Sequence, residues 1–418
     1  MQRVFVLSSV KKPLSPCHPA RARQLLKMGR ATVFRMAPFT IILKDRKNGN
    51  TSKTELKIDP GSCTTGIAIV QHNKRGRRVV WAANLQHRGF AIKKRLLKRQ
   101  QVRRGRRSRK TRYRQPRVNN RTRPQGWLPP SLMSRVVNVE TWVRRLLGFV
   151  PITSISVETA RFDMQLMANP KISSVEYQQG ELQGYEVREY LLERWGRKCA
   201  YCGAENIPME IEHIIPKARG GSDRVSNLTI SCKLCNQKKG TQTAAEFGYP
   251  DVQTQAKRPL RDAAAINTTR FVIGGILKSF GPPVAFWSGG RTKFNRVKQD
   301  YPKDHWIDAA CVGATGETVF ICSDHYPLLI KAVGRGRRQM CLMDKHGFPR
   351  TKPKQFKRVK GFQTGDMVKA TVTKGRKKGT YVGRVVIRAK GSFCIGKVDG
   401  ISWRYCRLLQ RADGYEYS

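Results

Sequence analysis

Four cysteines arranged as two Cys-x-x-Cys pairs have the spacing of a closed metal site. The first pair is Cys199 and Cys202, and the second is Cys232 and Cys235. Two such pairs are the ligand set of a tetrahedral zinc ion, because each short pair turns two thiolates toward one ion. The remaining cysteines are scattered, which favours reduced thiols over a secreted disulfide framework. We therefore predict one structural Zn²⁺ at these four residues.

The segment around these pairs also carries residues that a structural zinc ion does not need: Glu212-His213, Asn227 and Asn236. This pattern resembles the HNH nuclease family, whose ββα-metal core carries a His, a middle Asn and a third His or Asn. The resemblance implies that His213 is the general base that takes a proton from water. It implies that Asn227 fixes the loop that aims His213, and that Glu212 and Asn236 hold one Mg²⁺ at the scissile phosphate.

Two positions depart from the family pattern. Asn236 stands where many members have His, and Glu212 is one methylene longer than Asp. An amide oxygen and a carboxylate are both hard ligands suited to Mg²⁺, so both departures are compatible with the function. The alternative is a ribbon-type zinc module that binds nucleic acid without cutting it.

Acidic residues at the ends of two expected strands, and a third on an expected helix, form a second candidate site. The strand Leu56–Ile58 ends at Asp59, and the strand 152–157 ends at Glu158. His305 and Asp308 are three residues apart, so on a helix they face the same side. Taken singly, Asp59-Pro60-Gly61 is also an ordinary turn, and Asp304 could simply cap the helix that carries His305.

The order strand-end Asp, strand-end Glu, helical His-x-x-Asp resembles the split RuvC nuclease domain, which has an RNase H-like fold. The resemblance implies that Asp59, Glu158 and Asp308 bind two Mg²⁺ ions about 4 Å apart, with His305 as general base. The HNH pattern is inserted between the second and third acidic elements, a layout that few families share.

The segment between the first two acidic elements is strongly basic. Residues 60–139 contain no Asp or Glu, and residues 92–123 contain sixteen Lys and Arg. The segment resembles the arginine-rich bridge helix of the IscB family and of single-effector CRISPR nucleases, which lies along guide-RNA phosphates; the alternative is a disordered basic tail. The resemblance implies RNA contacts from Arg95, Arg99, Arg103, Arg106, Arg107 and Arg109.

The two ends of the chain complete this resemblance. Expected strands at Val4–Leu7, 31–34 and 39–43 enclose a helix that begins after His18, and Pro13-Leu14-Ser15-Pro16 is similar to the Pro-Leu-Met-Pro signature of the IscB leader domain. After residue 335, short strands at 366–372, 380–387 and 401–405 fit a small SH3-like β-barrel. In the family this region supports RNA and reads a motif beside the target. Candidate readers of guanine edges are Arg384, Arg388, Arg404 and Arg407, although phosphate contacts are the alternative for each.

We therefore predict an α/β multidomain protein with seven segments. They are an N-terminal domain (1–53), RuvC-I (54–90), the bridge helix (91–125), RuvC-II (126–180), the HNH domain (181–250), RuvC-III (251–335) and a C-terminal β domain (336–418).

The composition agrees with a nucleic-acid partner. The net charge is +54, from 82 Lys and Arg against 28 Asp and Glu, and such a field is neutralised best by a polyanion. The sequence contains no apolar run near the length of a membrane span and no signal-peptide core, so a cytoplasmic protein is expected, and the resemblance to the IscB family implies a prokaryotic one.

The resemblance implies a ribonucleoprotein in which a structured guide RNA, the omega RNA, directs cleavage of double-stranded DNA. A monomer is sufficient, because one chain carries both expected nuclease sites, although the sequence leaves the oligomeric state open. HNH would cut the guide-paired strand and RuvC the displaced strand. The alternatives are an RNA-independent homing or resolving endonuclease and a non-catalytic nucleic-acid scaffold protein.

Overall fold

The computed structural model describes residues 2–49, 51–107, 124, 126–159, 185–256, 261–334, 341, 344–345, 348–352 and 356–418. The chain divides into two compact units that both draw on distant parts of the sequence. The first unit comprises Met1–Thr54, Val80–Ile152 and Cys322–Ser418, and the second comprises Glu55–Val79 and Thr153–Ile321.

The first unit begins with a four-stranded sheet in the order β2-β1-β4-β3. The expected strands and helix are present, and the Pro13-Leu14-Ser15-Pro16 segment itself forms a strand. The elements are β1 (Val4–Leu7), β2 (Pro13–Cys17), α1 (Pro19–Lys27), β3 (Ala31–Arg35) and β4 (Thr40–Leu43). His18 caps α1 by accepting a hydrogen bond from the Ala20 N–H at 3.2 Å. Ala22 and Leu25 on α1 pack into the same core as Val4, Val6 and Ile41.

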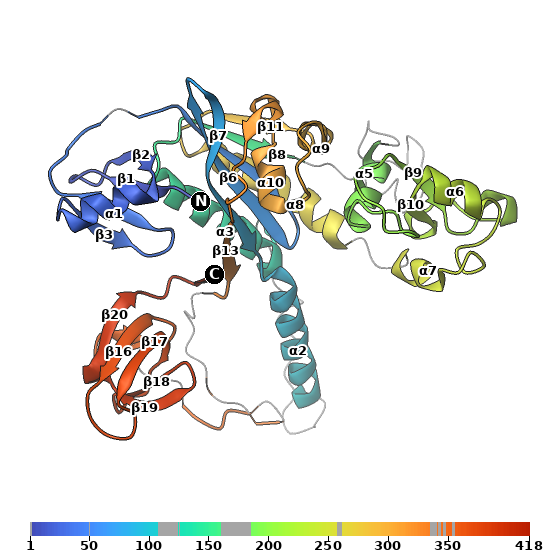
Figure 1. Cartoon of the computed structure of the whole chain (residues 1–418). Coiled ribbons are helices and arrows are strands. Elements are labelled where there is room, and N and C mark those ends of the chain that lie inside the picture. The colour runs from blue at the N-terminus through green and yellow to red at the C-terminus, as the bar shows by residue number, and fades with distance from the viewer. Residues whose placement is uncertain are drawn as a thin grey trace. The chain divides into compact units, whose positions relative to one another are not determined.

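Two long helices follow in the first unit, α2 (Gly89–Arg107) and α3 (Pro130–Leu147) (Figure 1). The apolar positions of α3 are buried at helical spacing, as the sequence pattern predicts: Val136, Val139, Val143 and Leu146. Strand β13 (Leu328–Ala332) lies between the C-terminal half of β7 (Gly76–Gln86) and β21 (Tyr415–Tyr417).

The C-terminal part of the first unit is a five-stranded antiparallel sheet in the order β19-β18-β17-β16-β20. Its strands are β16 (Met367–Val372), β17 (Gly379–Val386), β18 (Ser392–Ile395), β19 (Val398–Ser402) and β20 (Cys406–Gln410); a short hairpin, β14 (Arg358–Val359) and β15 (Phe362–Gln363), precedes them. The expected strand at 401–405 is wrong for its last three residues, which form a 3₁₀ turn. The Cys406 N–H closes this turn by donating to the Trp403 carbonyl, and the Trp403 N–H donates to the Gly391 carbonyl at 3.0 Å. Closure of the sheet into a barrel stays a prediction.

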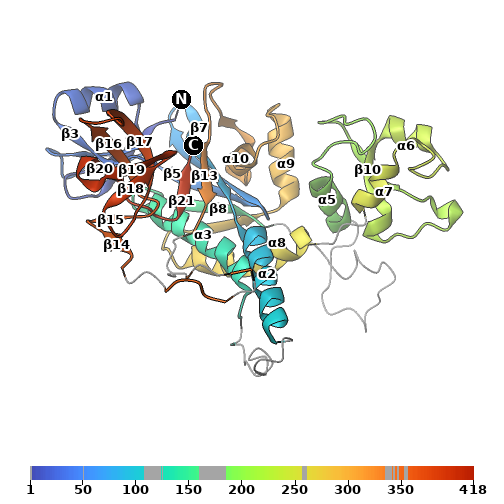
Figure 2. The ribbon, with the colours of Figure 1, turned by 90° about the horizontal axis from the view of Figure 1, so that it is seen from below.

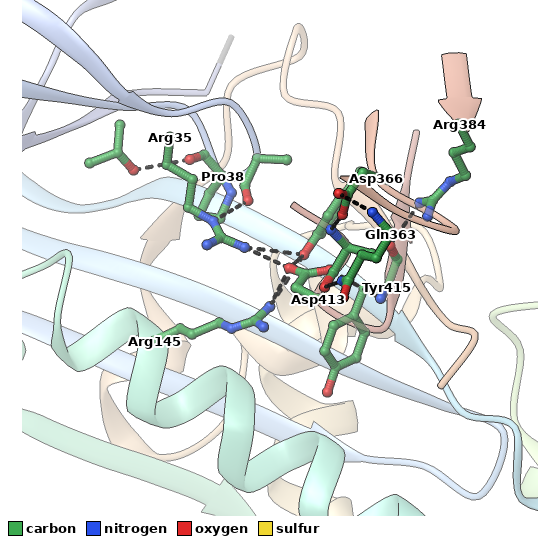
Figure 3. Close-up of polar contacts among 12 residues, drawn as sticks. Arg35, Pro38, Arg145, Gln363, Asp366, Arg384, Asp413 and Tyr415 are labelled. Atoms are coloured by element: carbon green, nitrogen blue, oxygen red, sulfur yellow. Dashed lines mark hydrogen bonds and ion pairs between the residues drawn. The ribbon is translucent and has the colours of Figure 1, made fainter. Parts of the chain in front are cut away.

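An ion cluster ties the last strand to the rest of the first unit. The Asp413 carboxylate accepts hydrogen bonds from Arg35 on β3 at 2.6 Å and from Arg145 on α3 at 3.0 Å (Figure 3). The hydroxyl of Tyr417 also bonds to Asp413. Three segments far apart in the sequence therefore share one carboxylate.

The second unit contains a sheet in the order β11-β8-β5-β6. The strands are β5 (Thr54–Pro60), β6 (Thr64–Asn73), β8 (Ser154–Glu158) and β11 (Val284–Trp287). Strand β8 pairs in parallel with both β5 and β11. Parallel strands are typically buried on both faces. Leu56, Ile58, Ile155 and Val157 are buried on one face of this sheet, and the neighbouring Lys57 and Ser156 are buried on the other. The helices of this part are α8 (Arg261–Lys278), α9 (Gly289–Lys298) and α10 (His305–Ala310) (Figure 2).

The remainder of the second unit is a small module with its own core. Its elements are α5 (Tyr185–Arg194), β9 (Met209–His213), β10 (Leu228–Cys232), α6 (Lys233–Lys239) and α7 (Pro250–Ala256), drawn in green to yellow in Figure 1. Strands β9 and β10 form an antiparallel hairpin in which His213 lies opposite Leu228. Four of these elements, α5, β9, β10 and α7, contribute buried residues to one hydrophobic core, which includes Leu191, Met209, Ile230 and Val252.

Candidate nuclease sites and basic surfaces

The four predicted zinc ligands meet in the small module. The Sγ atoms of Cys199, Cys202, Cys232 and Cys235 all lie within 4.8 Å of one another. Backbone N–H groups point at these sulfurs, including Cys232 N–H to Cys199 Sγ at 3.3 Å. Burial opposes ionisation of the Cys199 thiol, but the backbone N–H groups outweigh it and lower its pKa to about 7. Thiolates grouped in this way fit a tetrahedral Zn²⁺.

Replacing Cys235 with serine is expected to release zinc and unfold the module, because zinc binding and folding are linked in units of this size. Zinc content per protein, and the protease sensitivity of residues 185–256, measure the effect. Cys394→Ser, in the C-terminal sheet, is the matched control and should keep both unchanged. A Cys235→Ser protein that retains one zinc and a protected module would contradict the ligand assignment.

Asn227 closes the loop that follows His213. Its Oδ1 accepts from the Ile215 N–H at 2.9 Å, and its Nδ2 donates to the carbonyls of Ile215 and Ser222 at 3.0 and 2.9 Å. Gly221 lies inside this loop, where a Cβ atom would stand 1.7 Å from the Ile215 carbonyl oxygen, so only glycine fits. The loop-fixing contacts expected of Asn227 are therefore present.

The loop brings an aspartate to the proposed base. Nε2 of His213 lies 2.8 Å from Oδ1 of Asp223, and Nζ of Lys217 lies 3.0 Å from the same oxygen. Hydrogen bonds from His213 and Lys217 lower the pKa of Asp223, so it is a carboxylate that accepts from the ring. If Nε2 carries that proton, Nδ1 is the nitrogen left to accept one. Sequence reasoning missed Asp223; its place directly after Gly220-Gly221-Ser222 was the available signal.

The predicted magnesium ligands of this module have other partners. Glu212 is buried, and its two oxygens bind Lys239 Nζ and the Tyr201 hydroxyl, each at 2.5 Å. The Asn236 side-chain amide donates to Glu210 at 2.8 Å. Two carboxylates and an amide on facing elements are hard donors of the right chemistry. However, the charge of Glu212 is already balanced by Lys239, so the fit is incomplete and its role as a metal ligand stays a prediction.

The predicted acidic site lies in the second unit. Asp59 is near the end of β5 and Glu158 ends β8, and because these strands are parallel neighbours with Ile58 opposite Val157, the two acids lie at the same edge of the sheet. Asp308 lies on α10, and His305 Nδ1 is 3.9 Å from Asp59 Oδ2. The structure therefore brings all four predicted residues to one place.

The three acids act on one another electrostatically. Burial and then the charge of Asp59 raise the pKa of Glu158. Burial and Asp59 likewise raise the pKa of Asp308 to about 6, against the opposing effect of Arg296. A bond to Asp59 raises the pKa of His305 despite its burial. Carboxylates that resist ionising together are stabilised by a cation, so this donor set fits divalent metal ions.

Arg296, which sequence reasoning also missed, supplies a permanent positive charge at this site. Its Nε lies 2.9 Å from Asp308 Oδ1, and the side chain is only 2% exposed. A second bond, from Nη1 to the Tyr301 carbonyl at 3.0 Å, fixes the guanidinium. A single Arg in such a basic chain forms no recognisable motif with its sequence neighbours, so the pairing of Arg296 with Asp308 is evident only from the packing.

A glycine permits α10 to approach the sheet. A Cβ atom at Gly66 on β6 would stand 1.8 Å from the His305 carbonyl oxygen, at the start of α10. Gly66→Ala is therefore expected to displace the helix and destabilise the protein by about 1–3 kcal/mol, as overpacking does. Denaturant unfolding measures this. The control is Gly275→Ala on α8, where a Cβ would meet nothing within 4 Å; equal stability of the two variants would contradict the close approach.

Helix α2 carries the predicted RNA-binding arginines that the structure describes. Arg95, Arg99 and Arg103 are four residues apart and exposed, so they form one basic stripe, and Arg107 is partly exposed at the helix end. Arg109 and the side chain of Arg106 lie outside the described part of the chain. The helix therefore presents cations at regular spacing to solvent.

The four arginines proposed to read a target motif differ in their surroundings. Arg384 donates to the Tyr415 carbonyl at 2.8 Å, and Arg388 pairs with Asp399 at 2.7 Å. Arg404 and Arg407 are exposed. The first two thus have structural partners, and the last two face solvent on the C-terminal sheet.

Comparisons with known proteins agree with part of these assignments. Residues 4–180 match the family model of the RRXRR protein, and residues 199–250 match the model of the HNH endonuclease. No curated protein matches the chain. The small module is therefore an HNH endonuclease domain with a four-cysteine cluster, within a mixed α/β protein. In the described ranges, no helix is both long and apolar enough to cross a membrane.

Among solved structures, the chain is similar to Streptococcus thermophilus Cas9 in complex with the GGAA PAM, at 12% identity and a TM-score of 0.22, covering 62% of this chain and 32% of that one. It is also similar to the type II-C Cas9 of Actinomyces naeslundii, at 17% identity and a TM-score of 0.16, covering 45% of this chain and 32% of that one. The matched part is thus about a third of the length of either Cas9.

Proposed function

We propose that this protein is an RNA-guided DNA endonuclease of the IscB type, with an HNH site that cuts the guide-paired strand and a RuvC-type site that cuts the displaced strand. The observation that carries the proposal is the acidic site. Asp59, Glu158 and Asp308 come from distant segments, and the charge of Asp59 contributes to the raised pKa values of Glu158 and Asp308. The HNH domain is inserted between the second and third of these segments.

At the acidic site, the protein's contribution is to hold hard ligands and a base in place. Asp59, Glu158 and Asp308 would hold two Mg²⁺ ions, which supply a nucleophilic water and charge stabilisation at the leaving oxygen. His305 lies beside Asp59 and is the group placed to accept a proton. Arg296 holds Asp308 in one orientation through their 2.9 Å contact.

At the HNH site, His213 takes the proton from the attacking water. Asp223 orients the ring, and Asn227 holds the loop that carries Asp223. Glu212 and Asn236 remain our proposed ligands for one Mg²⁺, with Glu210 beside Asn236. The zinc ion at the four cysteines would support the fold of this domain and take no part in the chemistry.

The basic surfaces support an RNA partner. The net charge of +54 and the arginine stripe of α2 require many neutralising phosphates. A structured guide RNA bound along α2 would provide them, and Arg404 and Arg407 would be available for DNA beside the target. We propose a monomer, because one chain carries both nuclease sites.

The test is to purify the protein from cells that express its native locus and to sequence the RNA that accompanies it. The complex is then assayed with Mg²⁺ on a plasmid that matches the variable end of the RNA, with a scrambled plasmid as control. Guide-dependent cutting of both strands is the expected result. Cutting that ignores the RNA sequence would indicate a protein-guided endonuclease, and binding without cutting would indicate a scaffold protein.

A further inference from the structure

A lysine is completely buried beside the acidic site. Lys57, in the middle of β5, has 0% exposure and lies between the buried Leu56 and Ile58. Successive strand residues alternate faces, so Lys57 shares one face with Glu55 and Asp59. Lysine is almost never fully buried unless its charge is paired, because the ammonium group loses its hydration. Neither proposed mechanism uses this residue.

The ammonium group binds the end of α10. Its Nζ donates to the Val312 carbonyl at 2.7 Å. Val312 comes directly after Cys311, the C-cap of α10, and its own N–H donates to the Ala309 carbonyl at 3.2 Å. The ammonium group thus satisfies a carbonyl of the segment that directly follows the C-cap, near the helix C-terminus, where a positive charge is favourable. Lys57 therefore connects β5, which carries Asp59, to the helix that carries Asp308.

Neighbouring contacts fix the same segment from other sides. Glu55 balances the charge of Lys57 and accepts from Thr315 at 2.7 Å, Ser156 at 2.5 Å and His72 at 3.3 Å. Asn295 on α9 donates to the carbonyls of Cys311 at 2.8 Å and Gly313 at 2.6 Å. The carbonyls of residues 311–313 are thus each held by a side chain, and Lys57 is the one that comes from the strand of Asp59.

We propose that Lys57 is a positioning residue of the acidic site. It holds the segment after the C-terminal end of α10 against β5. Gly66 leaves the space that the N-terminal end of α10 occupies, and Asp308 lies between these two contacts. The helix has only six residues, so loss of one contact shifts its carboxylate. The inference rests on the proposed function of this site as a RuvC-type nuclease centre.

The test is Lys57→Met in the complete ribonucleoprotein, with each DNA strand labelled separately. Methionine fills the buried volume without the charge. We expect displaced-strand cutting to slow by about 10- to 100-fold, because a small misplacement of a reacting group has such an effect. The Mg²⁺ concentration for half-maximal displaced-strand cutting should rise, and guide-paired cutting should be unchanged. The matched control is Lys53→Met, at an exposed lysine just before β5.

Stability separates a positioning role from a purely structural one. Removing one member of a buried ion pair is destabilising, whereas replacing both members is often neutral or stabilising, so the unfolding midpoint should fall in Lys57→Met but not in the double variant Lys57→Met with Glu55→Gln. A lower midpoint with equal slowing of both strands, or an unchanged displaced-strand rate and Mg²⁺ dependence, would overturn the inference. Absence of displaced-strand cutting in the wild-type complex would overturn the proposed function as well.

A second variant covers the case in which Lys57→Met does not fold because it leaves Glu55 without its counter-charge. Lys57→Met with Glu55→Gln removes both charges and keeps the oxygen that accepts from Ser156 or Thr315. The same loss on the displaced strand is expected. A folded double variant that cuts the displaced strand at the wild-type rate would overturn the inference.

Discussion

An Asp59→Ala variant is expected to cut only the guide-paired strand. Asp59 interacts with each of the other three residues of the acidic site. Its charge raises the pKa values of Glu158 and Asp308, and its Oδ2 lies 3.9 Å from Nδ1 of His305. Removing it takes away a hard ligand whose metal-mediated charge stabilisation amounts to several kcal/mol. Displaced-strand cutting should therefore slow by about 10²-fold or more.

The measurement uses a duplex with a different label on each strand, so that each cut is followed separately. Asp59→Asn keeps the side-chain volume and should show the same strand-specific loss. Asp45→Ala removes an exposed aspartate that pairs only at the surface with Arg30, and it should cut both strands normally. Loss of both cuts in Asp59→Ala, with guide binding intact, would show that the two sites do not act independently.

A His213→Ala variant is expected to produce the opposite nickase. Its guide-paired cut should slow by about 10²–10⁴-fold, the usual contribution of a general base. The displaced-strand cut should continue, because the HNH domain has its own core and its own proposed base. Strand-resolved rates measure this in the same assay.

The matched control is His18→Asn, far from either site in sequence. Asparagine is a good helix N-cap, so the substitution preserves the cap that His18 provides for α1. Guide-paired cutting that survives in His213→Ala would remove His213 as the base. In that case the neighbouring Asp223, 2.8 Å away, would be the group to test next.

Local spacing predicted much of the HNH domain correctly, because its contacts are short-range in sequence. Two cysteines three residues apart face one ion almost regardless of what surrounds them, and the four thiols do meet. Asn227 clamps a loop only twelve residues away. The same spacing could not show that Glu212 would pair with Lys239 inside the module, because that contact depends on how α6 packs on the hairpin.

At the acidic site, whose residues lie far apart in the sequence, spacing again predicted some residues and missed others. Strand-end positions indicated Asp59 and Glu158, and helical spacing indicated His305 and Asp308. Sequence reasoning did not find Arg296, whose single cation is unremarkable among 82 Lys and Arg until it is buried against Asp308. Arg384 shows the reverse case, because a candidate DNA reader proves to bind the Tyr415 carbonyl.

Residue types and short-range spacing indicated the kinds of chemistry to expect: four cysteines spaced as zinc ligands, an HNH pattern, an ordered set of acids and a strong positive charge. Such features can be identified from sequence because local backbone geometry sets the direction in which side chains a few residues apart point. The partners of these residues became evident only from the packing of the folded chain, as with Lys57 and the Val312 carbonyl, which are 255 residues apart. Such contacts form because a buried polar group without a hydrogen bond is costly. Which group becomes its partner depends on how distant segments pack together.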